Sequence, residues 1–388
     1  MNQWVQSMLG EGQIGIVNDS VAVDVVDYWT YGSDDPLSST AVAVPAAVPQ
    51  CKDQNPYVLK GDGWVPQHIA IADRTVYAYF TIFMLFQFLL STSLNSIVIV
   101  VIYKFEELRQ PLNYIIVNLA LANLLRGGIG GFLSMLSNGA GYFFLGKGMC
   151  YAEGYAVSLF GCVGLNLIVV LVIERFLEVC KPFGSVRMGA KATWASIFVA
   201  WAWSFFWNTP FLMLRDGYEP EGLGTTCAPN WFVTGENERM FITLYYVCCF
   251  LLQYAVMVIC YWKLFLTLRE LAKETSPESS SPETEVLKMV VASVSAFFVS
   301  WLPYAAFVMY SVVNHTAQIS YESGAITAFL AKTTTICNPL LYVGLSRHFR
   351  DCVIRTFFAG RNPWTDDLSA SSMMSMASSQ ISSKVGPA

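Results

Sequence analysis

The chain has 388 residues, of which 54% are hydrophobic and only 13% charged, against roughly 25% charged residues in an ordinary soluble protein. With a mean hydropathy of +0.46, this composition excludes a soluble multi-domain enzyme and predicts a polytopic membrane protein. Sparse charge, 27 glycines and ten cysteines exclude disordered, collagen-like and disulfide-scaffold classes, and a net charge of −5 argues against a nucleic-acid partner.

Residues 1–75 are predicted to form an extracellular N-terminal tail. They contain five prolines and show no sustained helical period. They lack the basic start and continuous apolar run of a cleaved signal peptide, so the first membrane span is expected to direct insertion. Asn18-Asp19-Ser20 is a sequon for glycosylation, although such triplets also occur by chance.

Seven apolar segments follow, each of about 20–28 residues and able to cross a hydrocarbon core of roughly 30 Å. They lie at 76–102, 112–137, 148–174, 192–214, 239–266, 286–312 and 322–345. The prediction is an all-α fold, a seven-transmembrane-helix bundle over 76–345. Residues 346–360 are expected to form a short amphipathic helix on the membrane surface, and 361–388 a flexible Ser-rich cytoplasmic tail.

The distribution of Lys and Arg predicts the orientation. With the tail and alternate loops outside, six of these residues lie outside and fifteen inside, which accounts for 21 of the 23. The positive-inside rule then makes the N-terminus extracellular and the C-terminus cytoplasmic. The remaining two, Arg126 and Lys332, fall within predicted spans.

Lys332 lies ten residues past Glu322, about 15 Å into a helix that rises 1.5 Å per residue, which is too deep for easy snorkelling. A basic residue inside a span costs about 2.5–3.5 kcal/mol on insertion scales, so it usually has a partner and a role. Two interpretations are open. Lys332 forms an internal salt bridge, or its buried amine is free to condense with an aldehyde.

Three motifs together resemble the rhodopsin-like G-protein-coupled receptors. Span three ends in Glu174-Arg175-Phe176, span six contains Trp301-Leu302-Pro303-Tyr304, and span seven ends in Asn338-Pro339-Leu340-Leu341-Tyr342. Lys332, six residues before Asn338, resembles the opsins specifically, and vertebrate-type ciliary visual and pineal opsins in particular. The resemblance runs from about residue 76 to the end of the chain.

The resemblance implies a light-sensing receptor in which 11-cis retinal is bound covalently to Lys332 as a protonated Schiff base. Glu153 matches the opsin counterion by position, and an unpaired carboxylate there would be costly. Glu221 matches the second-loop carboxylate that opsins also use, with an exposed loop acid as an equal alternative. The other positions that align with the retinal pocket are Trp301, Tyr304, Gly161, Ser158, Trp231, Ala305 and Ala328.

Cys150 and Cys227 resemble the pair that ties span three to the second outer loop in this superfamily. The implied disulfide would hold that loop as a lid over the ligand. No metal site is expected, because His68, His315 and His348 are isolated in the sequence. The resemblance is to receptors, so no catalytic residue is expected either, and the protein is predicted not to be an enzyme.

The inner face is expected to carry the coupling to partners. The resemblance implies a switch made of Glu174, Arg175, Asn338, Pro339 and Tyr342, with Glu283 at the inner start of span six able to lock Arg175 at rest. The implied partners are a heterotrimeric G protein of the transducin/inhibitory class, a receptor kinase and arrestin, although Ser-rich tails are often only flexible. The implied location is the plasma membrane or a photoreceptor ciliary membrane.

Arg126 is a departure from the family, three residues after Asn123, which itself replaces the usual aspartate. One hypothesis is that Arg126 pairs with Glu153 or another pocket carboxylate and shifts the absorption maximum. The alternative is that it faces the bundle elsewhere, with water. Two other functions also remain, a retinal photoisomerase with little signalling and a chemically activated receptor without retinal. Lys332 with Glu153 argues against the second, and the intact inner motifs argue against the first.

Overall fold

The computed structural model describes residues 57–60, 63–66, 72–180, 188–214, 216–231, 235–274, 282–313 and 321–358. All of them belong to one compact unit, Pro49–Ala388. The sequon at Asn18 and the Ser-rich C-terminal segment lie outside the described residues, and so do the side chains of Glu283 and Glu322.

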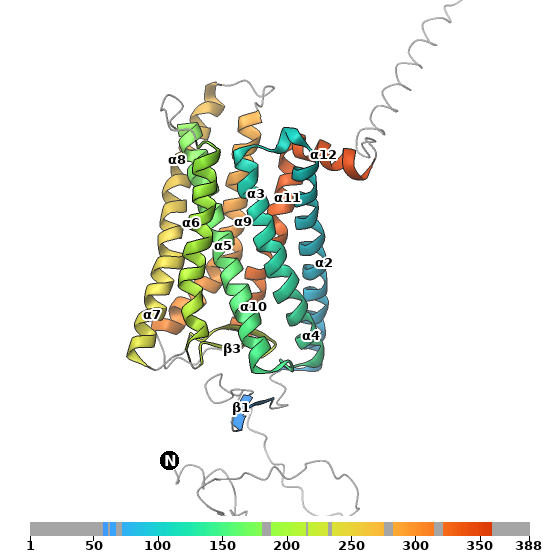
Figure 1. The fold of residues 1–388 in the computed structure, drawn as a ribbon, viewed down its shortest axis with the longest axis vertical. Helices are drawn as coiled ribbons and strands as arrows, with labels where there is room; N and C mark the ends of the chain where they lie inside the picture. The colour runs from blue at the N-terminus through green and yellow to red at the C-terminus, as the bar shows by residue number, and fades with distance from the viewer. Residues whose placement is uncertain are drawn as a thin grey trace, which may run out of the picture. The chain divides into compact units, whose positions relative to one another are not determined.

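Long helices run side by side and form the bundle (Figure 1). The first is α2, and the second is made of α3, the π-helical η2 and α4. The third and fourth are α5 and α6. The fifth joins α7, the π-helical η4 and α8, the sixth is α9, and the seventh joins α10 and α11. Their bounds are Arg74–Lys104 (α2), Pro111–Leu125 (α3), Arg126–Gly131 (η2), Phe132–Ala140 (α4), Gly146–Cys180 (α5), Ala190–Asn208 (α6), Glu236–Tyr246 (α7), Val247–Leu251 (η4), Leu252–Glu274 (α8), Pro282–Val313 (α9), Tyr321–Lys332 (α10) and Thr334–Leu345 (α11).

The predicted all-α seven-helix bundle is confirmed within these ranges. Five of the helices are long and apolar enough by themselves to cross a membrane. Of the other two, α6 carries four tryptophans and Lys191, which lower its hydropathy, and the seventh is divided at Thr333 into two helices of twelve residues. Both helices nevertheless belong to the bundle, because each packs against neighbouring helices.

In the seventh helix, a backbone carbonyl that lacks its helical hydrogen bond is satisfied by a side chain of α2. Pro339 lies inside α11 and has no N–H to donate to the carbonyl four residues before it, that of Thr335. The side chain of Asn95 on α2 donates to that carbonyl instead, at 2.8 Å. Gln87, also on α2, donates to the Thr335 hydroxyl at 2.8 Å. Buried amides of α2 therefore hold the helix that carries Lys332.

Glycines in η2 let α2 approach the second helix closely. A Cβ on Gly127 would overlap the side chain of Ser91, and one on Gly131 would overlap that of Gln87. The segment Arg126–Gly131 is a π-helical turn, a local widening that is common at functional sites. The turn begins at Arg126, whose side chain is buried.

Two short hairpins complete the described fold. Strands β1 (Tyr57–Lys60) and β2 (Gly63–Pro66) pair antiparallel. Strands β3 (Tyr218–Glu221) and β4 (Thr226–Pro229) also pair antiparallel, with Glu221 opposite Thr226. The turn between β3 and β4 requires positive φ at Gly222 and Gly224. The β3–β4 hairpin packs on α5, and the disulfide Cys150–Cys227 ties them together.

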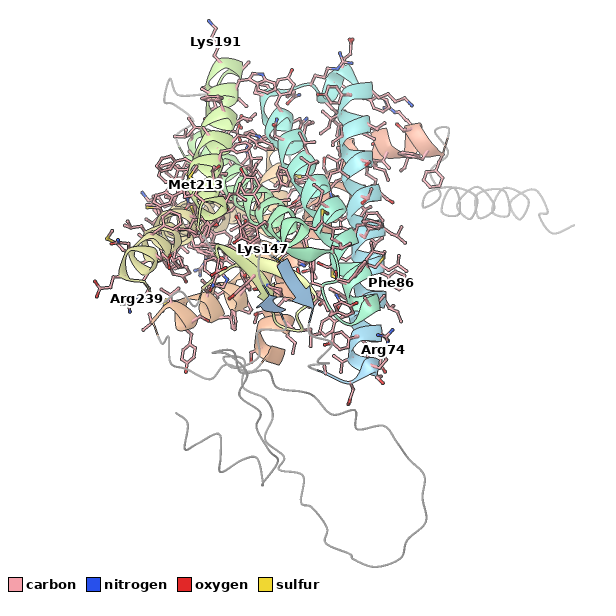
Figure 2. The ribbon with its side chains drawn as sticks, turned by 60° about the horizontal axis from the view of Figure 1, so that its bottom comes forward. Arg74, Phe86, Lys147, Lys191, Met213 and Arg239 are labelled. Atoms are coloured by element: carbon pink, nitrogen blue, oxygen red, sulfur yellow. A yellow bond between two sulfur atoms is a disulfide. The ribbon has the colours of Figure 1, made fainter. Side chains whose placement is uncertain are left out.

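The outside of the bundle is apolar, as a membrane-facing surface must be. Met213, Phe198 and Val299 are 82%, 72% and 71% exposed, and Figure 2 shows side chains projecting from the helices all round, with Lys191 and Arg74 near opposite ends. After α11, helix α12 (Arg347–Phe357) turns away from the bundle (Figure 1). It buries Phe349, Cys352 and Ile354, which confirms the amphipathic helix predicted after span seven.

Candidate functional site

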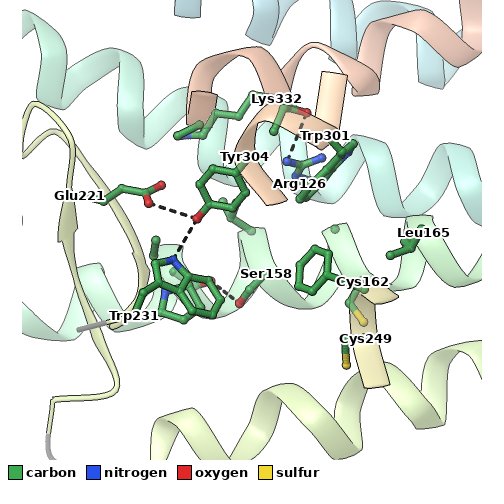
Figure 3. Close-up of a pocket in the computed structure, with 18 of the residues that line it drawn as sticks. Arg126, Ser158, Cys162, Leu165, Glu221, Trp231, Cys249, Trp301, Tyr304 and Lys332 are labelled. Atoms are coloured by element: carbon green, nitrogen blue, oxygen red, sulfur yellow. Dashed lines mark hydrogen bonds between the residues drawn. The ribbon is translucent and has the colours of Figure 1, made fainter. Parts of the chain in front are cut away.

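A cavity of about 630 Å³ lies inside the bundle, lined by residues of η2, α5, the β3–β4 hairpin, η4, α9 and α10 (Figure 3). Most of the predicted pocket residues line it: Lys332, Glu221, Trp301, Tyr304, Gly161, Ser158, Trp231 and Ala328. Ala305 does not. It is buried, and its carbonyl accepts a hydrogen bond from Tyr246 at 3.0 Å. Glu153 also lies outside the lining, because two hydroxyl groups stand between it and Lys332.

Those hydroxyls link the Lys332 ammonium to the Glu153 carboxylate. Nζ of Lys332 donates to Ser134 Oγ at 2.8 Å and to Thr226 Oγ1 at 2.6 Å. Both hydroxyls donate to Oε1 of Glu153, at 2.7 Å from Ser134 and 3.0 Å from Thr226. The backbone N–H of Cys227 donates to the other carboxylate oxygen at 3.2 Å. Glu153 is completely buried and Lys332 is 5% exposed, so the two charges compensate each other through a relay shielded from solvent.

Four elements, α10, α4, α5 and β4, bring this relay together. Lys332 is the last residue of α10, Ser134 lies on α4, and Glu153 lies on α5 one turn after Cys150. The disulfide fixes Cys227 beside that turn, which places the preceding Thr226 against the carboxylate. The predicted pairing of Cys150 with Cys227 is therefore present, and it positions donors for Glu153 as well as holding the hairpin.

Glu221 reaches the same cavity from β3. Its Oε2 accepts a hydrogen bond from the Tyr304 hydroxyl at 3.1 Å, and that hydroxyl accepts one from Trp231 Nε1 at 3.2 Å (Figure 3). Burial raises the pKa of the Glu221 carboxyl to about 7, against the opposing attraction of Lys332. The alternative of an exposed loop acid does not describe this side chain.

The side chains that connect the predicted ones were not predicted from the sequence. Ser134 and Thr226 carry the relay, and Tyr218 on β3 has its hydroxyl 3.2 Å from that of Ser158. A hydroxyl on an apolar span carries no charge signal. For Thr226 the only available clue was its place next to Cys227.

Among the described residues, Arg126 pairs with neither Glu153 nor Glu221, so the predicted pairing with a pocket carboxylate is wrong; its effect on the absorption maximum stays untested. Its guanidinium donates to the Thr334 hydroxyl at 3.2 Å and to the Ala331 carbonyl at 3.5 Å. It also lies over the Trp301 ring, with Cζ 4.6 Å from the ring centroid. Arg126 therefore faces the seventh helix and Trp301, and it makes no hydrogen bond to the carboxylate relay.

At the end of α5 that lies away from the disulfide, Arg175 forms ion pairs with Glu174 and with Glu178, one turn further along the helix. Glu174 and Arg175 are 9% and 7% exposed. Asn338, Pro339 and Tyr342 lie on α11, and the side chains of Asn338 and Tyr342 are buried. Since the side chain of Glu283 lies outside the described residues, its contact with Arg175 stays a prediction.

One histidine is less isolated than its place in the sequence indicates. His348 lies with Glu107 and Cys352 in a group whose possible ligand atoms are all within 4.8 Å of one another. Arg355 binds the same Glu107 carboxylate at 3.3 Å, and Cys352 Sγ lies 3.5 Å from it. The reason given above for expecting no metal site therefore does not hold for His348, although an arginine already occupies the carboxylate.

Comparison with known proteins identifies the family. Residues 94–342 match the family model of the 7 transmembrane receptor (rhodopsin family). The chain belongs to this family. It is 39% identical to parapinopsin of Ictalurus punctatus over 305 residues, 78% of this chain and 88% of that protein. It is 36% identical to pinopsin of Columba livia over 300 residues, 77% of this chain and 86% of that one.

The fold agrees with that assignment. The structure of squid rhodopsin matches with a TM-score of 0.69 at 21% identity, covering 80% of this chain and 92% of that one. The chain is thus a light-sensing receptor of the opsin group and a multi-pass membrane protein, and it signals rather than catalyses. As an opsin it takes a retinal chromophore and has a heterotrimeric G protein as its partner.

Proposed function

We propose that Lys332 holds 11-cis retinal as a protonated Schiff base, with Glu153 as its counterion and Glu221 as a second carboxylate. One observation carries the proposal. The buried amine of Lys332 lines a mostly apolar cavity. Two hydroxyl groups join it to the fully buried carboxylate of Glu153.

The residues present fit such a ligand. The cavity is lined mostly by apolar and aromatic side chains with a few polar groups, as small-molecule sites usually are. Trp301, Phe297 and Phe250 supply aromatic walls, and Gly161 keeps one wall flat, with Trp301 as its near neighbour. Once bound, retinal supplies a light-driven isomerisation, and its attachment joins the aldehyde carbon to Nζ with loss of water.

The chain's own groups then have separate roles. Glu153 balances the positive charge at Nζ, while Ser134 and Thr226 orient the nitrogen between them. The β3–β4 hairpin, fixed by the disulfide, excludes water from the outer end. Trp301 and Tyr304 both line the cavity from α9, on either side of Pro303, where the helix lacks a backbone donor. A change of ligand shape can therefore push on the helix whose inner end belongs to the switch.

For the inner face we propose that Arg175 and Asn338-Pro339-Tyr342 form the switch, with Glu283 as the resting partner of Arg175. Burial of the Glu174–Arg175 pair and of Asn338 and Tyr342 supports this. The proposed partners are a transducin/inhibitory-class G protein, a receptor kinase and arrestin. The proposed setting is the plasma membrane or a photoreceptor ciliary membrane, with the tail that carries Asn18 outside, glycosylated there, and the Ser-rich tail inside, as the basic residues indicate.

Reconstitution of the full chain with 11-cis retinal tests the proposal. We expect a visible absorption band that shifts on illumination, disappears in Lys332→Ala, persists in the exposed-lysine control Lys104→Ala, and drives nucleotide exchange on a G protein. Glu153→Gln should move the band to the ultraviolet, since the positive charge loses its partner. A photoactive pigment without nucleotide exchange would favour the photoisomerase alternative, and no pigment in the folded wild type would refute the proposal.

A further inference from the structure

A second, smaller cavity adjoins the first and shares Arg126, Gly161 and Trp301 with it. Its volume is about 220 Å³, about a third of that of the first cavity. Its polar lining comes from Asn123, Arg126, Thr334, Asn338 and the Trp301 indole, and the described residues that line it include no Asp or Glu. The cavity thus holds one positive charge and no negative one.

Two donors at this cavity have nothing to bind. Nε of Arg126 and Nδ2 of Asn123 are both buried and have no hydrogen-bond partner among the described residues. Both side chains are only 5% exposed. Nε faces the surface that both cavities share, because a Cβ built on Gly161 would lie 3.6 Å from it. A buried polar group without a partner in the protein requires an explanation, and a bound ion or water molecule is one of them.

The charge of Arg126 is also uncompensated by the protein. The partners of its guanidinium are a hydroxyl, a carbonyl and an aromatic ring, all uncharged. A cation over an aromatic face is attracted by the ring. Removing a charge from water carries a large desolvation penalty that an uncharged ring offsets only in part. The Glu153 carboxylate is already occupied by the lysine relay and the Cys227 N–H, and Glu221 is bonded to Tyr304.

We propose that the smaller cavity is a buried chloride site, in which Arg126 supplies the charge and the Asn123 amide a further donor. A singly charged ion matches the single cation, and a halide suits a lining that is otherwise apolar, since it has no hydrogens to place. The side chain at position 123 decides whether the cavity binds an anion. An aspartate there would neutralise Arg126 within the protein, whereas an asparagine leaves the place open.

The site has a structural consequence. Thr334 Oγ1 accepts hydrogen bonds from Arg126 and from Trp301 Nε1, the latter at 3.2 Å, so the ion, the arginine and the indole share one network. Bound chloride holds Arg126 against Trp301 and thereby holds α9 to the seventh helix. Its loss frees a positive charge beside the cavity that contains Lys332.

Chloride binding is tested on the retinal-free receptor, so the result does not depend on the chromophore. Binding of ³⁶Cl⁻ to the purified full chain is measured at equilibrium, and its melting temperature is compared in sodium chloride and sodium gluconate of equal ionic strength. We expect saturable binding of one ion per chain and a higher melting temperature in chloride, because a ligand that binds only the folded state stabilises it.

Three variants separate the site from general salt effects. Arg126→Met should abolish saturable binding, while Arg74→Met, which removes an exposed arginine, should leave it unchanged. Asn123→Asp should also abolish binding yet melt in gluconate at least as high as the wild type in chloride, since its carboxylate replaces the ion. A folded wild type that binds no chloride, or Asn123→Asp that binds it normally, would show that the cavity holds only water and overturn the proposal.

Discussion

Replacing Thr226 with valine tests the relay between Lys332 and Glu153. The substitution keeps the shape of the side chain but removes the hydroxyl that accepts from Nζ at 2.6 Å and donates to the carboxylate at 3.0 Å. A hydrogen bond to a charged group contributes about 1.5–3 kcal/mol, so two of them amount to about 3–6 kcal/mol before the remaining partners adjust. Ser134 still links the two charges, which places the expected cost near the lower end of that range.

The neighbouring Thr225 gives a matched control. It is fully buried as well, but its hydroxyl donates to the neutral Asn138 amide at 3.1 Å. A neutral hydrogen bond contributes about 0.5–1.5 kcal/mol, so Thr225→Val should cost about 2 kcal/mol less than Thr226→Val. Thermal melting of the retinal-free receptor should therefore give a lower melting temperature for Thr226→Val than for Thr225→Val, by about 2–4 °C.

A double-mutant cycle identifies the source of the difference. In the Lys332→Met background, Thr226 has lost its bond to the ammonium group, so Thr226→Val should cost less by about one charged hydrogen bond, roughly 1.5–3 kcal/mol. The same comparison for Thr225→Val should show no coupling. Equal melting temperatures of the two threonine variants, or an unchanged cost of Thr226→Val in the methionine background, would refute the relay.

Further predictions concern the walls of the site. Gly154→Ala should destabilise the receptor by about 1–3 kcal/mol, because its Cβ would overlap the Tyr218 ring. Gly148→Ala, with open space around it, should be neutral or stabilising by up to about 1 kcal/mol. Thermal melting curves of the two variants test this difference. Cys227→Ser should cost about 2–5 kcal/mol and make the melting temperature insensitive to reducing agent, so a variant that still responds to it would contradict the assignment of the disulfide. Burial raises the pKa of the Glu219 carboxyl from 4.5 to about 8, so its contribution to stability is complete below about pH 4.5 and is lost as the pH rises toward 8. Glu219→Gln should therefore flatten the fall in melting temperature over that interval, and a profile as steep as that of the wild type would rule this out.

The sequence indicated the positions of the helices because membrane burial demands long apolar segments, which composition reveals directly. The observed helices begin within four residues of the predicted spans, but their ends differ from the predicted ones by up to eight residues, as at the end of α8. The sequence did not indicate the division of the seventh helix at Thr333 or the π-helical turn that begins at Arg126. Both depend on neighbours, since amides of α2 satisfy the opened backbone and glycines allow the close approach.

The same division holds for the site. Lys332 and Glu153 stood out because a charge inside a span is costly, and motif spacing together with family resemblance drew attention to Cys150, Cys227 and Trp301. Their actual connection runs through Ser134 and Thr226, two hydroxyls 92 residues apart in sequence, which only folding brings to the same carboxylate.

Arg126 shows most clearly which properties the sequence determines and which depend on the tertiary structure. The sequence by itself determined that a second positive charge is buried in the bundle, because composition and span length do not depend on side-chain direction. Only the tertiary structure decided where that charge points, toward Thr334 and Trp301 and away from Glu153. The physical reason is that burial follows from the average polarity of a segment, whereas pairing depends on atomic positions set by several helices at once.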